Sequence, residues 1–70
     1  MKQVIANMAG TVINLLVQAG DQVTEGQDVV VLESMKMEVP LQAESSGTVA
    51  EIKANIGDFV NEGDVILVLE

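Results

Sequence analysis

The chain contains one internal repeat, which runs without a gap at a spacing of 37 residues. Gly10-Thr11-Val12 recurs as Gly47-Thr48-Val49, and Val31-Leu32-Glu33 recurs as Val68-Leu69-Glu70. All six glycines fall into pairs at this spacing: Gly10 with Gly47, Gly20 with Gly57, and Gly26 with Gly63. Glycine is the residue that accepts a positive φ or the close approach of another backbone. Each half therefore needs the same three special backbone positions, and we expect these glycines to lie in structural turns.

A repeat unit of this length cannot fold by itself, because about 35 residues do not enclose a stable core. We therefore expect a single domain over residues 1–70, in which halves of about 1–33 and 38–70 pack together about a pseudo-twofold axis. Hydrophobic residues make up 49% of the chain and are mostly aliphatic, and the β-branched types among them favour strands. Short apolar segments between frequent glycine turns predict an all-β sandwich or barrel.

Eight short strands are expected between these turns. They are Gln3–Ala6, Gly10–Val17, Gln22–Thr24, Asp28–Ser34, Met37–Gln42, Gly47–Lys53, Phe59–Asn61 and Asp64–Leu69. Pro40 marks the strand that contains it as an edge strand, because proline cannot donate a hydrogen bond to a sheet ladder.

Residues 34–37 have no counterpart in the second half, because the chain ends at Glu70, the repeat mate of Glu33. We expect a hairpin here, with Met35 and Lys36 as its turn residues, at the end of the body opposite the termini. Two-residue hairpin turns favour Asn-Gly or Asp-Gly, since they need positive φ. Met-Lys is therefore a poor local choice, and a local rule broken in an otherwise consistent sequence is expected at a functional site.

The neighbours of Lys36 support two interpretations. Met35 and Met37 flank it, and methionine is over-used at adaptable binding surfaces, so these side chains could serve recognition together with Glu33 and Glu38. Alternatively, Lys36 serves solubility, Met37 is tucked inward as core filler, and the two glutamates are a solvated rim.

Composition excludes several classes of function. The formal net charge is −8, with Lys2, Lys36 and Lys53 as the only cations, which makes nucleic acid or an anionic membrane a poor partner. The absence of Cys and His excludes disulfides, a Cys/His zinc site and the common nucleophile–base pairs of enzymes. No segment resembles a signal peptide or a membrane span, so a cytoplasmic location is expected.

The segment Glu33-Ser34-Met35-Lys36-Met37-Glu38 resembles the attachment motif of biotinyl domains, whose core is Met-Lys-Met after a small residue. That small residue is usually Ala and is Ser34 here. The flanking halves, residues 10–33 and 47–70, also resemble the biotinyl/lipoyl carrier family, so that the resemblance covers essentially the whole chain. It implies a flattened β-barrel, or barrel-sandwich of two antiparallel sheets, with the lysine on an exposed turn. The gapless repeat leaves no room for the inserted thumb that some biotinyl domains carry.

The resemblance further implies that a biotin protein ligase joins biotin to Lys36 and that Ser34, Met35, Met37, Glu33 and Glu38 are recognised by the ligase or by partners. Biotin carboxylase and carboxyltransferase components would then use the group. The chain itself would be a non-catalytic monomer. Lipoate on the same lysine, acceptance of both groups, and an unmodified interaction module remain as alternatives.

Overall fold

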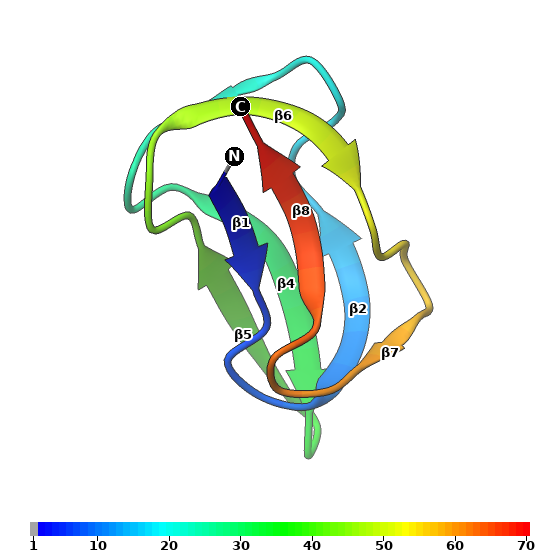
Figure 1. The fold of residues 1–70 in the computed structure, drawn as a ribbon. Helices are drawn as coiled ribbons and strands as arrows, with labels where there is room; N and C mark the ends of the chain where they lie inside the picture. Colours follow the sequence, from blue (N-terminus) through cyan, green and yellow to red (C-terminus); the bar gives the residue numbers. More distant parts are fainter. Residues whose placement is uncertain (1) are drawn as a thin grey trace.

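The computed structural model describes residues 2–70, which form eight strands and no helix (Figure 1). The strands are β1 (Lys2–Ile5), β2 (Gly10–Leu15), β3 (Gln22–Val23), β4 (Asp28–Ser34), β5 (Met37–Gln42), β6 (Gly47–Ile52), β7 (Phe59–Val60) and β8 (Val65–Leu69). The all-β prediction is confirmed, and every expected strand lies within two residues of the observed bounds. No helix in this part of the chain is long and apolar enough to cross a membrane.

The strands form two four-stranded antiparallel sheets, in the orders β1-β8-β6-β3 and β5-β4-β2-β7. The two orders match position by position, because each strand of one sheet is the repeat mate of the strand at the same position in the other: β1 with β5, β8 with β4, β6 with β2 and β3 with β7. A pseudo-twofold axis requires this correspondence. The connecting hydrogen bonds obey the same relation: Gly20 N–H donates to the Val49 carbonyl and Gly57 N–H donates to the Val12 carbonyl, each at 2.8 Å. The predicted pseudo-twofold arrangement is therefore confirmed.

The repeated Gly-Asp pairs build matching turns. Gly20 has a φ of 94°, and the Asp21 carboxylate accepts a hydrogen bond from Gln18 N–H at 2.9 Å. Gly57-Asp58 repeats this turn with a φ of 96° and a bond of 2.9 Å from Asn55 N–H. Because glycine accepts positive φ without a steric penalty and aspartate bonds nearby backbone amides, this dipeptide specifies the turn.

Gly10 and Gly47 serve a different purpose from the other four glycines. They begin β2 and β6, so the expectation that they lie in turns is wrong. A Cβ on Gly10 would lie 2.8 Å from the Glu33 carbonyl oxygen, and one on Gly47 would lie 2.8 Å from that of Glu70. These two glycines are needed because a neighbouring backbone approaches too closely for any side chain.

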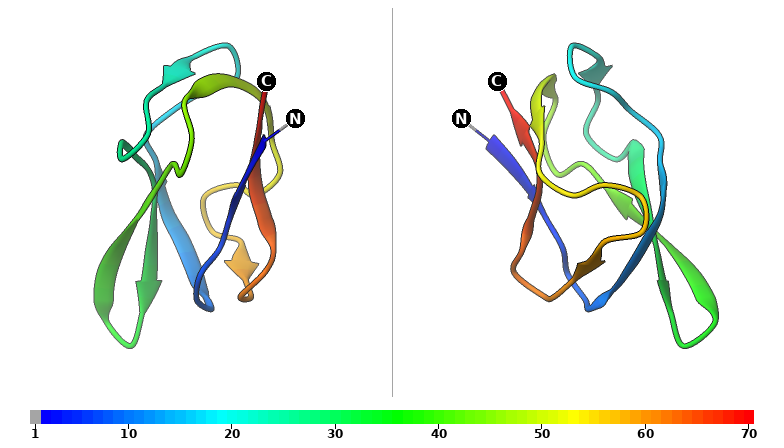
Figure 2. Two further views of the ribbon diagram at one scale, coloured as in Figure 1. Left: turned by 60° about the vertical axis from the view of Figure 1, so that its left-hand side comes forward. Right: turned by 90° about the vertical axis from the view of Figure 1, so that its right-hand side faces the viewer.

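The core lies between the two sheets and is entirely aliphatic. Its largest fully buried side chains are Leu32, Ile66, Leu67, Leu69, Val12, Val29, Val30 and Val49. Within residues 2–70 no polar side chain is buried. The edge position expected for the strand with Pro40 is confirmed, since β5 is the outer strand of its sheet. The start of β1 and the end of β8 lie at one end of the body, whereas the β4–β5 hairpin projects from the other (Figures 1 and 2).

Candidate functional site

The β4–β5 hairpin closes with a two-residue turn. The strands pair in register as far as Ser34 opposite Met37, which leaves Met35 and Lys36 between them. Met35 has a φ of 53° and Lys36 a φ of 64°, and they are the only residues other than glycine in the described chain with positive φ. This is the primed turn that matches the right-handed twist of the flanking strands. The prediction of a two-residue turn formed by Met35 and Lys36 is confirmed, and both residues adopt the positive φ that disfavours them there.

The turn stores backbone strain at the site. A left-handed conformation costs roughly 1–2 kcal/mol for a residue with a Cβ, and Met35 and Lys36 both adopt it. Strained residues persist where the surrounding structure imposes them, and they cluster at functional sites. Here β4 is paired on one side with β5 and on the other with β2, so the hairpin has a firm base. The fold thus imposes a conformation that Asn-Gly would adopt more easily.

Lys36 presents its amine to solvent. Its side chain is exposed and makes no hydrogen bond or salt bridge within residues 2–70. The other two lysines are engaged: Lys2 Nζ donates to the Ser46 carbonyl at 2.8 Å, and Lys53 Nζ lies 3.3 Å from a carboxylate oxygen of Glu51. Lys36 is therefore the lysine that a partner can approach without breaking a contact.

Both methionines that flank Lys36 are exposed. Met35 is 91% accessible and Met37 is 66% accessible, so the alternative that Met37 fills the core is wrong. Side chains alternate along a strand, which puts Met37 and the half-buried Ser34 on the inward side, with Leu32. Met37 nevertheless stays accessible because the hairpin projects from the body (Figure 2). Lys36 is therefore flanked by two accessible apolar side chains.

Glu33 and Glu38 face each other directly across β4 and β5, and both are exposed. Like charges in such a pair destabilise a sheet slightly. Neither carboxylate forms a salt bridge with Lys36 in the described structure. The two acids are thus brought together beside the turn, but they leave the amine unpaired.

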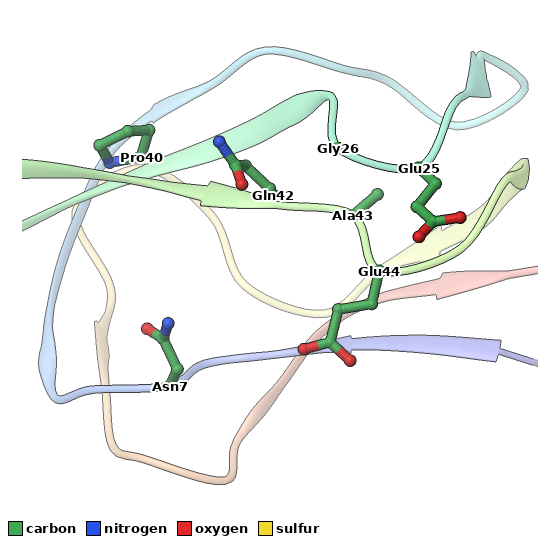
Figure 3. Close-up of a pocket in the computed structure, with 7 residues that line it drawn as sticks. All are labelled: Asn7, Glu25, Gly26, Pro40, Gln42, Ala43 and Glu44. Atoms are coloured by element: carbon green, nitrogen blue, oxygen red, sulfur yellow. The ribbon is translucent and has the colours of Figure 1, made fainter.

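The site is convex. The hollow drawn in Figure 3 has a volume of about 350 Å³ and is lined by Asn7, Glu25, Gly26, Pro40, Gln42, Ala43 and Glu44. None of residues 33–38 lines it. A projecting lysine suits a group that is presented to other proteins rather than a substrate held in a cleft.

Sequence reasoning did not single out Phe59, an exposed aromatic residue on β7. The β7 strand pairs with β2, and β2 pairs on its other side with the hairpin strand β4. The signal that could have found it is the repeat itself, because the mate of Phe59 is Gln22.

Comparison with known proteins supports these features. The chain is 56% identical over 39 residues to the biotin/lipoyl attachment protein of Bacillus subtilis, which covers 56% of this chain and 53% of that protein. It is 45% identical over 42 residues to the biotinylated protein TB7.3 homolog of Mycolicibacterium smegmatis, covering 60% and 59% of the two chains. The matched segments thus span between half and three-fifths of these curated relatives.

Solved structures and a family model extend the likeness to the whole chain. A single-chain, multi-domain long-chain acyl-CoA carboxylase matches with a TM-score of 0.86 and 32% identity, over 94% of this chain and 7% of that one. The urea carboxylase of Kluyveromyces lactis matches with a TM-score of 0.90 and 30% identity, over 99% and 6%. The family model described as "Biotin-requiring enzyme" matches residues 2–69. The chain therefore belongs to the biotin/lipoyl domain family.

Proposed function

We propose that the chain is a carrier of biotin, which is attached covalently to Lys36 and carries a carboxyl group between carboxylase components. The observation that supports this most is the presentation of Lys36. Its amine has no partner within residues 2–70, on a strained turn that projects from the body between two accessible methionines. The relatives named as biotinylated, and the carboxylases that share the fold, support the choice of group.

The attachment step needs one nucleophile from the chain. The unprotonated Nζ of Lys36 attacks the carboxyl carbon of biotin that a biotin protein ligase has activated as an adenylate. The new C–N bond forms as the bond to the phosphate oxygen of AMP breaks, and the nitrogen loses one proton. The product is a neutral amide, so the modification removes the charge of Lys36.

The chain supplies position in this function, and partner enzymes supply the catalysis. Bound biotin would accept and give up the carboxyl group in the active sites of biotin carboxylase and carboxyltransferase components. Residues 33–38 hold the attachment point away from the body, and none of them lines the hollow of Figure 3. We propose that the domain acts as a monomer in the cytoplasm, where these enzymes would reach it.

Lipoate on Lys36 is the second candidate, favoured by one relative that is named a biotin/lipoyl attachment protein. The two groups are distinguished by presenting the unmodified chain with biotin and a bacterial biotin protein ligase, or with lipoate and a lipoate protein ligase, each with ATP. Intact mass should show faster and complete addition of biotin. Faster addition of lipoate would contradict the biotin assignment and leave a lipoyl carrier.

A further inference from the structure

The pseudo-twofold axis places Phe59 and Gln22 in equivalent positions. Phe59 pairs with Thr11 between β7 and β2, and Gln22 pairs with Thr48 between β3 and β6. The same scaffold therefore accepts either residue. The aromatic ring at position 59 is not a requirement of the fold, and another reason is needed for its presence.

Positions 56 and 59 carry large exposed apolar residues that the equivalent positions of the other half lack. Phe59, the single aromatic residue of the chain, is 64% exposed, and Ile56 is 61% exposed. The equivalent residues in the other half are Gln22 and Ala19. Isolated exposed hydrophobics are ordinary, but a large one before Gly57 and another at the start of β7, where the symmetric segment has neither, indicate a contact surface. We refer to Ile56 and Phe59 as the apolar patch.

Within the apolar patch, Phe59 lies in the same sheet as the lysine hairpin, with only β2 between β7 and β4. Thr11 pairs with Phe59 on one side and with Glu33 on the other. Residues directly opposite each other put their side chains on the same face, and this is the outer face because Glu33 is exposed while Leu32 is fully buried. Phe59 lies two strand spacings, or about 10 Å, from Glu33, which is close in sequence to Lys36.

A protein that encloses Lys36 from this side covers the apolar patch as well. Specific interfaces bury about 800 Å² on each partner, which is wide enough to include both. Aromatic side chains are enriched in the buried centre of such interfaces, because they add apolar area with little loss of side-chain freedom. The patch thus has the composition and the position of a docking anchor beside the site of modification.

The length of the lysine side chain favours one partner over the others. Before modification, only the lysine side chain separates the reacting nitrogen from the hairpin, so the acylating enzyme must bring its active site close to the sheet. After modification, biotin lies at the end of a longer arm and can enter an active site farther from the sheet. Contacts beside the hairpin therefore matter most to the ligase.

We infer that Phe59 and Ile56 form a docking patch for the biotin protein ligase, whose surface receives the Phe59 ring in an apolar socket. The inference rests on the proposed function, since it names the partner of the same site. It makes Phe59 a specificity-determining residue for the modification, without a role in the chemical step.

The test uses Phe59→Gln, which places at position 59 the residue found at the symmetric position 22. The matched control is Gln22→Ala, at that symmetric position on β3. The rate of biotin transfer is measured with a purified bacterial biotin protein ligase, saturating ATP and biotin, and varied unmodified chain. Truncating an interface anchor costs enough to change affinity about tenfold. We expect Phe59→Gln to lower kcat/KM about tenfold through KM, Phe59→Leu to recover part of the loss, and Gln22→Ala to match the wild type.

Each other outcome counts against the inference. Equal KM values for wild type and a folded Phe59→Gln, or an equal loss in Gln22→Ala, would overturn it while leaving the carrier function intact. Normal ligation followed by impaired use of the biotinylated variant by biotin carboxylase would assign the patch to that enzyme instead. A dimer in sedimentation that Phe59→Gln dissociates would assign it to a second copy. Wild-type chain that takes no biotin would contradict the proposed function itself.

Discussion

Lys36 combines a strained backbone with a side chain that has no partner inside residues 2–70. These two features separate Lys36 from Lys2 and Lys53, whose side chains are both engaged. The strain follows from the two-residue connection, since only turns with positive φ match the twist of the strands. The proposed function needs Lys36, and the positive φ of this residue lowers the stability of the folded domain.

Relieving the strain should stabilise the domain while destroying the site. Lys36→Gly and Lys36→Ala both remove the amine, but only glycine accepts a φ of 64° without the penalty of a Cβ. We expect Lys36→Gly to be more stable than Lys36→Ala by about 1 kcal/mol in denaturant unfolding. If the alanine variant is equally stable or more so, the turn is not strained as described.

Met35 and Met37 should affect recognition more than stability. Both are exposed, and exposed substitutions usually change stability by about 0.5 kcal/mol or less. Replacing both with Ala should therefore slow biotin transfer by a ligase while thermal melting barely moves. A large loss of stability with normal transfer would show that they pack against the body.

The backbone at the turn could be predicted from residues 34–37 because few conformations join two strands through two residues. The exposure of Met37 could not, since alternation gives the face of a strand and not how far a hairpin projects from the body. For the same reason the sequence did not show that Lys36 remains unpaired beside Glu33 and Glu38. That depends on side-chain positions in three dimensions.

The paired glycines of the turns and strands meet two different backbone requirements, a positive φ or the close approach of another backbone. Gly26 and Gly63 have φ of 87° and 95° with open space where a Cβ would be. Gly10 and Gly47 instead lie against the carbonyl oxygens of Glu33 and Glu70. The repeat shows that all of them are structural, but the spacing alone does not distinguish a turn from a close approach.

Substitutions within a glycine pair should therefore have similar effects. Gly26→Ala and Gly63→Ala each force a Cβ into the left-handed region, so each should destabilise the domain by roughly 1 kcal/mol. Gly10→Ala should cost more, because a Cβ 2.8 Å from the Glu33 carbonyl oxygen requires the backbone to move. Urea unfolding measures all three. A folded Gly26→Ala that resists modification would place that glycine in a binding site.

In the whole molecule, the parts that follow the pseudo-twofold symmetry form the scaffold, and the parts that depart from it are those that we assign to function. The two sheets have equivalent strand orders, equivalent turns and one aliphatic core. The departures from symmetry include the apolar patch, whose two residues replace Ala19 and Gln22 of the other half. A scaffold of this kind holds one segment away from the body, and the fold needs neither an enclosed cleft nor a buried charged group to do so.

Site-resolved mass spectrometry shows whether Lys36 is the attachment point of biotin. Wild type, Lys36→Ala and Lys53→Ala are incubated with biotin, ATP and a bacterial biotin protein ligase, and the intact chains and their fragments are weighed. Wild type and Lys53→Ala should each gain one biotinyl group, located on Lys36, and Lys36→Ala should gain none. Biotin on Lys36→Ala, or on Lys2 or Lys53 of the wild type, would show that Lys36 is not the specific attachment point.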